Sequence, residues 1–252
     1  MSGRRAAGLK LAILSSASCR SACAICAPRK SPSSKAAAAA SATFPTPRSP
    51  PSGTPLINWA FGFAPNDLYF AGGRGTILHY DGTSWTVKPA PLGVSENLYG
   101  VWASGPNNVW AVGGFGRILR YDGNVWTNVT NPAFLTLYGI WGVSPTDIWT
   151  AGDSSTTTSQ GTFLHYNGTT WAVDAAGSAL TQSALNGVWG SSAQDVWAVG
   201  AQGTLLHYNG TTWAVDSKSG TLTQNTLLGI WGSGPEDIWV TGGGGTILRY
   251  HP

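Results

Sequence analysis

The chain has 252 residues, of which 42% are hydrophobic, 11% aromatic and 10% charged, and it contains 13 tryptophans. Its net charge of +3 hides an asymmetry: residues 1–56 carry eight Lys or Arg and no acid, whereas residues 57–252 carry six basic and eleven acidic residues. A mildly acidic domain is a poor match for nucleic acid, and no stretch has the roughly 20 apolar residues of a membrane span, so we expect neither a nucleic-acid partner nor a span.

Residues 1–56 are predicted to be a disordered leader, because they are rich in Ala, Ser, Pro and basic residues. Arg4 and Arg5, followed by the short apolar run at residues 11–14, resemble a secretory signal. We therefore expect an extracytoplasmic or secreted protein. A leader without targeting function, produced by a start assigned too far upstream, and lipidation at Cys19 are the alternatives.

All three cysteines, Cys19, Cys23 and Cys26, lie in this leader with C-x₃-C-x₂-C spacing. The same spacing occurs in the iron–sulfur ligand motif of radical SAM enzymes, which are built on a barrel of alternating strands and helices that this sequence does not resemble. We therefore predict no metal site and no cofactor. The remainder of the chain has no cysteine and needs no disulfide.

From Ile57 onward one sequence unit is repeated nearly five times. The copies begin at Ile57, Leu98, Leu137, Leu185 and Leu227, at spacings of 41, 39, 48 and 42 residues. Self-similarity at such a period is typical of propellers and solenoids. We assign the copies to residues 57–97, 98–136, 137–184, 185–226 and 227–252.

The four complete copies each contain four short runs, which in the second copy read LYGVWAS, NVWAVG, RILRYD and VWTNV. They are rich in Val, Ile, Trp and Tyr and are bounded by Gly, Pro, Asn or Asp, which indicates strands. Asp-Gly or Asn-Gly pairs such as Asp81-Gly82 and Asn209-Gly210 separate the third and fourth runs and predict type I′ hairpin turns. Each complete copy is therefore predicted to be a four-stranded antiparallel meander.

A single meander of this size cannot bury both faces, so the copies are expected to pack face to face around an axis. The predicted fold is an all-β propeller of about five four-stranded blades, with tryptophans at repeating strand positions as the core. The repeating histidines His79, His165 and His207 are interpreted as structural, because their spacing is that of the repeat.

The fifth copy stops after Tyr250 and before a fourth strand, so its blade is predicted to be incomplete. Three arrangements stay open: an irregular strand from residues 53–57 completes it, the blade has three strands, or the chain is part of a larger ring. A closed ring predicts a monomer, whereas an open arc predicts self-association through an exposed edge.

The string GVWGSSAQDVWAVGAQGTLLHYNGTTW, from residues 187–213, resembles the repeats of bacterial secreted propellers of the neuraminidase-repeat (BNR/Asp-box) group and of the related photosystem II assembly-factor family. The resemblance covers residues 57–252. It implies a β-propeller whose first strands line the axis. An Asp-box has five residues from Asp to Trp, whereas Asp81 to Trp85 spans four, and a sialidase's arginine triad, Tyr/Glu pair and acid Asp find no counterpart here.

Loop lengths divide the predicted propeller into two faces. The aromatic residues of strands one and two are eight residues apart in all five copies, and Tyr to Trp across strands three and four is five in the four complete copies. The connections from strand two to three, and from strand four to the next blade, vary and lie on the opposite side, the variable face. Recognition usually sits in variable loops, so the candidate ligand-binding residues are Arg74, Phe115, Arg117, Asp153 and Gln202.

No catalytic set is predicted, because most acids occupy turn positions that recur from copy to copy. The predicted function is therefore a non-catalytic, extracytoplasmic binding or scaffold module that uses its variable face for a glycan or protein partner. A five-bladed lectin with one sugar site per blade and a protein-assembly factor are the alternatives. The remaining alternative is a glycoside hydrolase with carboxylates drawn from Glu96, Asp153 or Asp174.

Overall fold

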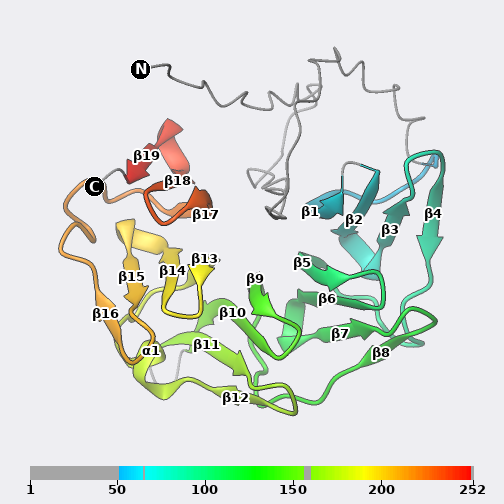
Figure 1. Cartoon of the computed structure of the whole chain (residues 1–252), viewed down its shortest axis with the longest axis horizontal. Helices are drawn as coiled ribbons and strands as arrows, with labels where there is room; N and C mark the ends of the chain where they lie inside the picture. The colour runs from blue at the N-terminus through cyan, green and yellow to red at the C-terminus, as the bar shows by residue number, and fades with distance from the viewer. Residues whose placement is uncertain (1–50, 65, 156–159, 251–252) are drawn as a thin grey trace, which may run out of the picture.

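The structure is a computed structural model that describes residues 51–64, 66–155 and 160–250. It confirms the predicted all-β fold: five antiparallel sheets stand as blades around a common axis and form a five-bladed propeller (Figure 1). Most of the predicted leader, residues 1–50 with all three cysteines, lies outside the described residues. In the described ranges no helix is long and apolar enough to cross a membrane.

Within each blade the strands follow one another from the axis outward (Figure 1). Blade 1 contains β1 (Ile57–Ala64), β2 (Asp67–Gly72), β3 (Ile77–Tyr80) and β4 (Trp85–Lys88), and blade 2 contains β5 (Leu98–Gly105), β6 (Asn108–Gly113), β7 (Ile118–Tyr121) and β8 (Trp126–Asn128). Blade 3 contains β9 (Leu137–Ser144), β10 (Asp147–Ser154), β11 (Gly161–Tyr166) and β12 (Trp171–Val173). Blade 4 contains β13 (Leu185–Ser192), β14 (Asp195–Gly200), β15 (Leu205–Tyr208) and β16 (Trp213–Val215), and blade 5 contains β17 (Leu227–Gly234), β18 (Asp237–Gly242) and β19 (Ile247–Tyr250).

The inner strands β1, β5, β9, β13 and β17 all begin at the residue predicted to open a copy. The constant spacing of eight also has its structural meaning, because the aromatic residues of strands one and two are direct cross-strand partners. In blade 2 Trp102 pairs with Trp110, and in blade 4 Trp189 pairs with Trp197. Such pairs are the unit of sheet stabilisation, so the repeat length follows from the register.

The predicted tryptophan core lies between consecutive blades. Four apolar clusters join blade 1 to 2, 2 to 3, 3 to 4 and 4 to 5, and Trp110 and Trp149 are 1% and 4% exposed within them. Close approach requires glycine on the inner strands, because a Cβ on Gly190 would lie 2.7 Å from the ring of Trp141 in the preceding blade. Each blade therefore buries its apolar face only against its neighbour.

A polar pair within each blade ties the third strand to the turn between the first two strands. His207 Nε2 lies 2.8 Å from Asp195 Oδ1, and Trp197 Nε1 donates to the same oxygen at 2.9 Å. His79 and His165 make the same contact with Asp67 and Asp147 at 2.6 and 2.7 Å. The structural interpretation of the histidines is thus confirmed, because each serves its own blade.

The turns between the third and fourth strands differ from the prediction. A type I′ turn needs positive φ at both central residues, yet only the glycine has it: Gly82 has φ 92°, while Asp81 is not in the left-handed region. Asp81 Oδ1 instead accepts backbone N–H bonds from Thr83 and Ser84 at 2.9 and 2.8 Å. These connections are Asx turns, in which the carboxylate or amide replaces the backbone pairing of a hairpin.

Of the arrangements left open for blade 5, the described residues show the three-stranded blade, with its strands in the order β17-β18-β19. Residues 53–56 add no strand to it, and β1 pairs with β2 alone. The packing of inner strand on inner strand that joins successive blades is not repeated between β17 and β1. The described blades therefore form an arc, with blades 1 and 5 at its ends (Figure 1).

Candidate functional site

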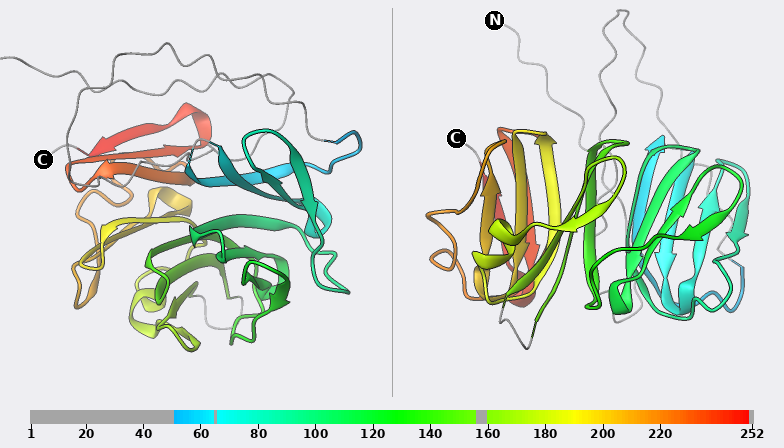
Figure 2. Two further views of the ribbon diagram at one scale, coloured as in Figure 1. Left: turned by 45° about the vertical axis from the view of Figure 1, so that its right-hand side comes forward. Right: turned by 90° about the horizontal axis from the view of Figure 1, so that it is seen from below.

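The meander places the connections of each blade on two opposite faces of the propeller (Figure 2). The turn face carries the Asx turns and the turns that hold the His–Asp pairs. The variable face carries the loops between second and third strands and the links between blades, which include residues 73–76, 89–97, 114–117, 129–136, 174–184, 201–204, 216–226 and 243–246. Because the turn face is taken up by recurring structural contacts, the variable face is the candidate site.

Three predicted site residues, Arg74, Phe115 and Gln202, occupy the same place in different blades. Each is the middle residue of a 3-10 turn between the second and third strands: η1 (Gly73–Gly75), η2 (Gly114–Gly116) and η3 (Ala201–Gly203). Their φ angles of 56°, 53° and 57° are the only positive ones at non-glycine residues in the described chain. A side chain in the left-handed region costs about 1–2 kcal/mol, and such strain at loop tips is a pointer to function.

Blade 5 provides the relaxed form of this loop, since η4 (Gly243–Gly245) has Gly244 at the tip with φ 62°. The loop conformation therefore needs no side chain at this place. The three side chains that do occur there differ in chemistry and surroundings. Phe115 is 80% exposed, and Gln202 Oε1 accepts a bond from Ser183 Oγ at 3.3 Å.

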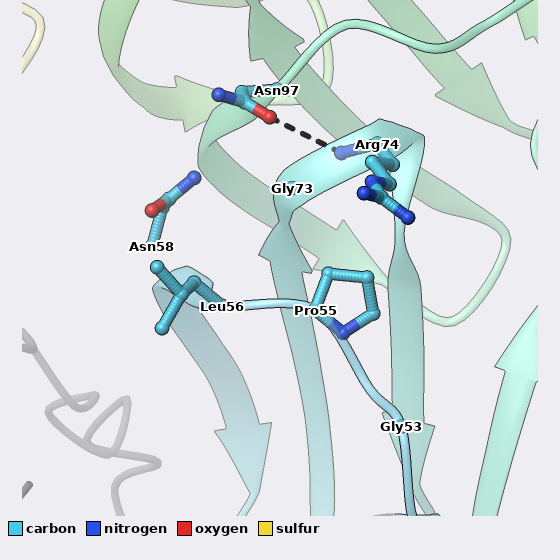
Figure 3. Close-up of a pocket in the computed structure, with 7 residues that line it drawn as sticks. All are labelled: Gly53, Pro55, Leu56, Asn58, Gly73, Arg74 and Asn97. Atoms are coloured by element: carbon cyan, nitrogen blue, oxygen red, sulfur yellow. Dashed lines mark hydrogen bonds between the residues drawn. The ribbon is translucent and has the colours of Figure 1, made fainter.

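Arg74 belongs to a pocket of about 450 Å³ on the variable face (Figure 3). The pocket is lined by Gly53, Pro55, Leu56, Asn58, Gly73, Arg74 and Asn97. Asn97 Oδ1 accepts the backbone N–H of Arg74 at 3.2 Å, which fixes the loop against the link from blade 1 to blade 2. The guanidinium of Arg74 has no ion-pair partner among the described residues, so its charge is open to a ligand.

Arg117 is engaged differently. Its Nη2 lies 2.5 Å from Glu96 Oε1, and its Nη1 donates to Asn128 Oδ1 at 2.9 Å. The hydrogen bond from Arg117 holds the pKa of the Glu96 carboxyl below its ordinary value. The side chain thus already ties β8 to the link between blades 1 and 2, and a binding role for it stays a prediction.

Asp153, the fifth predicted residue, lies near the end of β10 and beside two tyrosines of the inner strands. Burial raises the pKa of Tyr138 above its ordinary value, and the negative charge of Asp153 and the neighbouring Tyr99 add to the effect. The rings of Tyr99 and Tyr138 meet edge to face at 5.4 Å between centroids. Asn97 Nδ2 in turn lies 3.5 Å from the Tyr99 hydroxyl.

These tyrosines belong to a row that sequence reasoning missed. In every blade the inner strand has a register shift at its second residue, and the residues at that place are Asn58, Tyr99, Tyr138, Asn186 and Leu228. Bulges are common beside functional sites, where they re-aim a side chain. The available signal was that this single position varies between copies while the residues beside it hardly change.

The carboxylates considered for glycoside hydrolysis all have local structural partners. Glu96 pairs with Arg117, and Asp153 Oδ1 accepts the N–H of Ser154 at 2.8 Å. Asp174 caps the short helix α1 (Ala175–Ala179) by accepting the N–H of Gly177 at 2.6 Å. Among the described residues no group of three or more His, Cys, Asp or Glu side chains could hold a metal ion.

Comparison with known proteins finds no matching family model and no matching curated protein. Solved structures do match. YCF48 from Cyanidioschyzon merolae aligns with a TM-score of 0.61 at 19% identity, over 82% of this chain and 72% of that one. A streptogramin B lyase aligns at 0.54 and 14% identity, over 78% and 68%.

What is shared is the fold. A further structure, YCF48 bound to D1 peptide, aligns with a TM-score of 0.46 at 17% identity, over 78% of each chain. The likeness to YCF48 from Cyanidioschyzon merolae confirms a propeller similar to the photosystem II assembly-factor group. At these identities the comparison establishes the architecture, and function has to be argued from the variable face of this chain.

Proposed function

We propose that this protein is a non-catalytic, extracytoplasmic binding or scaffold module that holds a protein partner on its variable face. The observation that carries the proposal is the set of strained loop tips, where Arg74, Phe115 and Gln202 project different chemistry from equivalent places. The export-like leader supports the extracytoplasmic location. The local engagement of Glu96 and Asp174 supports a role without catalysis.

The pocket at Arg74 favours an acidic group of the partner. The guanidinium of Arg74, which has no ion-pair partner among the described residues, lines the same pocket as Asn58 and Asn97 and points away from their amide groups (Figure 3). Arginine recognises carboxylates through directed, charge-assisted hydrogen bonds. An Asp, a Glu or a chain-terminal carboxylate of the partner suits this arrangement.

A glycan is the second candidate, and one observation favours it. Tyr99 and Tyr138 form an aromatic pair on the inner strands of the variable face, and aromatic faces with hydroxyl groups can stack on sugar rings while bonding their hydroxyls. A lectin with one equivalent site per blade fits less well, because the loop tips carry Arg74, Phe115, Gln202 and Gly244 rather than one residue type.

A displayed library of random peptides, run beside a glycan array, tests the proposal. We expect the library to yield acidic peptides that bind the protein, and Arg74→Gly to weaken their binding about tenfold or more, the usual size of a lost charged hydrogen bond. Glycine is the matched replacement, because blade 5 uses it at the same loop position. The double variant Arg74→Gly/Phe115→Gly should abolish binding while the fold stays intact.

Arg120 provides the control, since it is an exposed arginine that contacts Asn108 toward the turn face. Arg120→Gln should leave peptide binding unchanged. Selected peptides that bind Arg74→Gly as well as the wild type would contradict the assignment of the pocket. A silent peptide library together with several weak, equivalent glycan signals would replace the protein partner by a lectin function.

A further inference from the structure

Two strands of the propeller have the same sequence in different surroundings. β7 and β19 both read Ile-Leu-Arg-Tyr. In β7, Ile118 and Tyr121 are 1% and 7% exposed, whereas the equivalent Ile247 and Tyr250 of β19 are 66% and 46% exposed. The sequence of β19 is therefore that of an interior third strand, yet it forms the outer edge of blade 5.

The outer backbone edge of β19 pairs with no strand in the described part of the chain, and the other blades show which of its groups would accept a partner. In blades 2, 3 and 4 the carbonyl of the equivalent residue accepts an N–H from the segment that ends the fourth strand. The bonds are Val129 to Ile118 at 2.9 Å, Asp174 to Phe163 at 2.9 Å and Asp216 to Leu205 at 3.0 Å. No strand follows β19 in the described part of the chain, so this carbonyl of Ile247 faces outward.

An open edge is a template for another strand unless charge or proline blocks it. The only charged residue of β19, Arg249, does not block the edge. Its Nε donates to Asp237 Oδ1 at 2.9 Å and its guanidinium lies 4.9 Å from the ring centroid of Trp239, both within blade 5. The charge is thus held toward β18 and away from the free edge.

The four complete blades show which chemistry fits the edge. Their fourth strands begin with Trp, continue with Thr or Ala, and have Val or Asn third. The Trp is the cross-strand partner of the Tyr that ends the third strand, and the two rings lie 5.1–5.3 Å apart. In blade 5 no residue that the structure describes takes this aromatic place beside Tyr250, and the Tyr250 side chain is 46% exposed.

We propose that the outer edge of β19 binds an extended segment of a partner protein by antiparallel strand addition, with an aromatic residue seated beside Tyr250 and a Val-type residue two positions later. This site is separate from the variable-face pocket. A second copy is a poorer occupant, because every Trp-first strand of this chain is already paired within its own blade. Strand addition supplies affinity through main-chain bonds and specificity through alternate side chains.

The chain itself provides the probe. A fluorescent peptide with the sequence of residues 209–216, Asn-Gly-Thr-Thr-Trp-Ala-Val-Asp, reproduces a natural fourth strand. We expect it to bind the 252-residue chain in an anisotropy titration and to slow amide exchange at Ile247 and Arg249. A peptide with Ala in place of Trp213, or Pro in place of Ala214, should bind about tenfold more weakly, through loss of the ring contact or the strand pairing.

Protein variants locate the site. Tyr250→Ala should weaken binding of the probe by a similar factor. Phe134→Ala, which removes another exposed ring on the variable face, should leave probe binding unchanged. Circular dichroism and unfolding curves establish that both variants keep the fold. Because the probe is not directed at the pocket, Arg74→Gly should also bind it normally, so failure here is distinguishable from failure of the proposed function.

Three results would overturn the proposal. One is equal binding of the Trp and Ala peptides, or of wild type and Tyr250→Ala. Another is an edge at β19 that is already protected from exchange in the free protein, which means that something else covers it. The third is a concentration-dependent dimer in sedimentation that the probe dissociates, which assigns the edge to a second copy.

Discussion

Blades 2 and 5 share a four-residue strand and a common fold, but they differ in what lies beside them. Blade 2 has a fourth strand and a following blade, and its Trp110 is 1% exposed. Blade 5 has neither within the described residues, and its equivalent Trp239 is 38% exposed. The apolar core of each blade is thus supplied by its neighbours, as expected for a repeat architecture.

The contacts inside the two blades are nevertheless alike. Arg120 Nε bonds to Asn108 Oδ1 at 3.2 Å in blade 2, and Arg249 Nε bonds to Asp237 Oδ1 at 2.9 Å in blade 5. In both blades the guanidinium lies over the tryptophan of the second strand. A blade therefore forms its polar pair by itself and depends on the ring only for burial, and this separation can be tested by matched substitutions.

The largest expected effect comes from the matched tryptophans. Trp110→Ala empties a site between blades 2 and 3 and should lower the free energy of unfolding by about 3–5 kcal/mol, the usual range for a buried Trp. Trp239→Ala removes a ring that already contacts solvent and should cost no more than about 1.5 kcal/mol. Urea unfolding followed by far-UV circular dichroism measures both, and equal costs would break the comparison.

Glycines at the ends of two loops give the next contrast. A Cβ at Gly116 would lie 2.1 Å from the carbonyl oxygen of Ala133, in the link that leads to blade 3, whereas a Cβ at Gly245 meets nothing within 4 Å. Both have positive φ, 70° and 75°. We expect Gly245→Ala to cost about 1–2 kcal/mol, the price of a left-handed Ala, and Gly116→Ala clearly more, because the backbone of the link must move.

Thermal unfolding of the two alanine variants measures this difference. If Gly116→Ala were no worse than Gly245→Ala, the link to blade 3 would not be packed against η2 at Gly116.

The smallest expected effect is a difference in the pH dependence of stability between the polar pair of blade 5, Arg249 and Asp237, and that of blade 2, Arg120 and Asn108. Hydrogen bonds from Ser233 and Arg249 hold the pKa of Asp237 below its ordinary value, whereas the equivalent Asn108 does not titrate. Since the folded-state pKa is the lower one, the stabilisation by Asp237 is present above the ordinary Asp range and is lost as the pH falls through the folded-state pKa. Exposed pairs contribute up to about 1 kcal/mol.

The free energy of unfolding, measured at a series of acidic pH values, should therefore depend less steeply on pH in Asp237→Asn and more steeply in Asn108→Asp than in the wild type. Identical curves for Asp237→Asn and wild type would show that the pair in blade 5 does not contribute.

Much of the fold was predictable because it depends on local chemistry that repeats. The inner strands begin at Ile57, Leu98 and the other predicted positions because Gly, Pro, Asn and Asp punctuate every copy. The turn type was not predictable from Asp81-Gly82 alone, because the side chain of Asp81 bonds to its own loop. The spacing of blades 1 and 5 was not predictable either, because it depends on crossing angles between sheets, which the repeat pattern does not encode.

The candidate site was predictable only in part. Loop variation pointed to the variable face and to the tips at Arg74, Phe115 and Gln202, but not to their shared backbone conformation. The sequence alone could not show that Arg117 forms an ion pair while Arg74 does not, because the partner of Arg117, Glu96, lies 21 residues away in the link between blades 1 and 2. The bulged tyrosines Tyr99 and Tyr138 escaped notice because the strand pattern around them is that of a core strand.

Amide hydrogen exchange in the free protein tests the central contrast most directly, by comparing Ile118 and Arg120 of β7 with Ile247 and Arg249 of β19. The account predicts that the β7 amides exchange more slowly by about two orders of magnitude or more, because β8 covers them while the edge of β19 faces solvent. Equal protection of the two identical strands would contradict the account, since it would mean that blade 5 is covered on its outer edge.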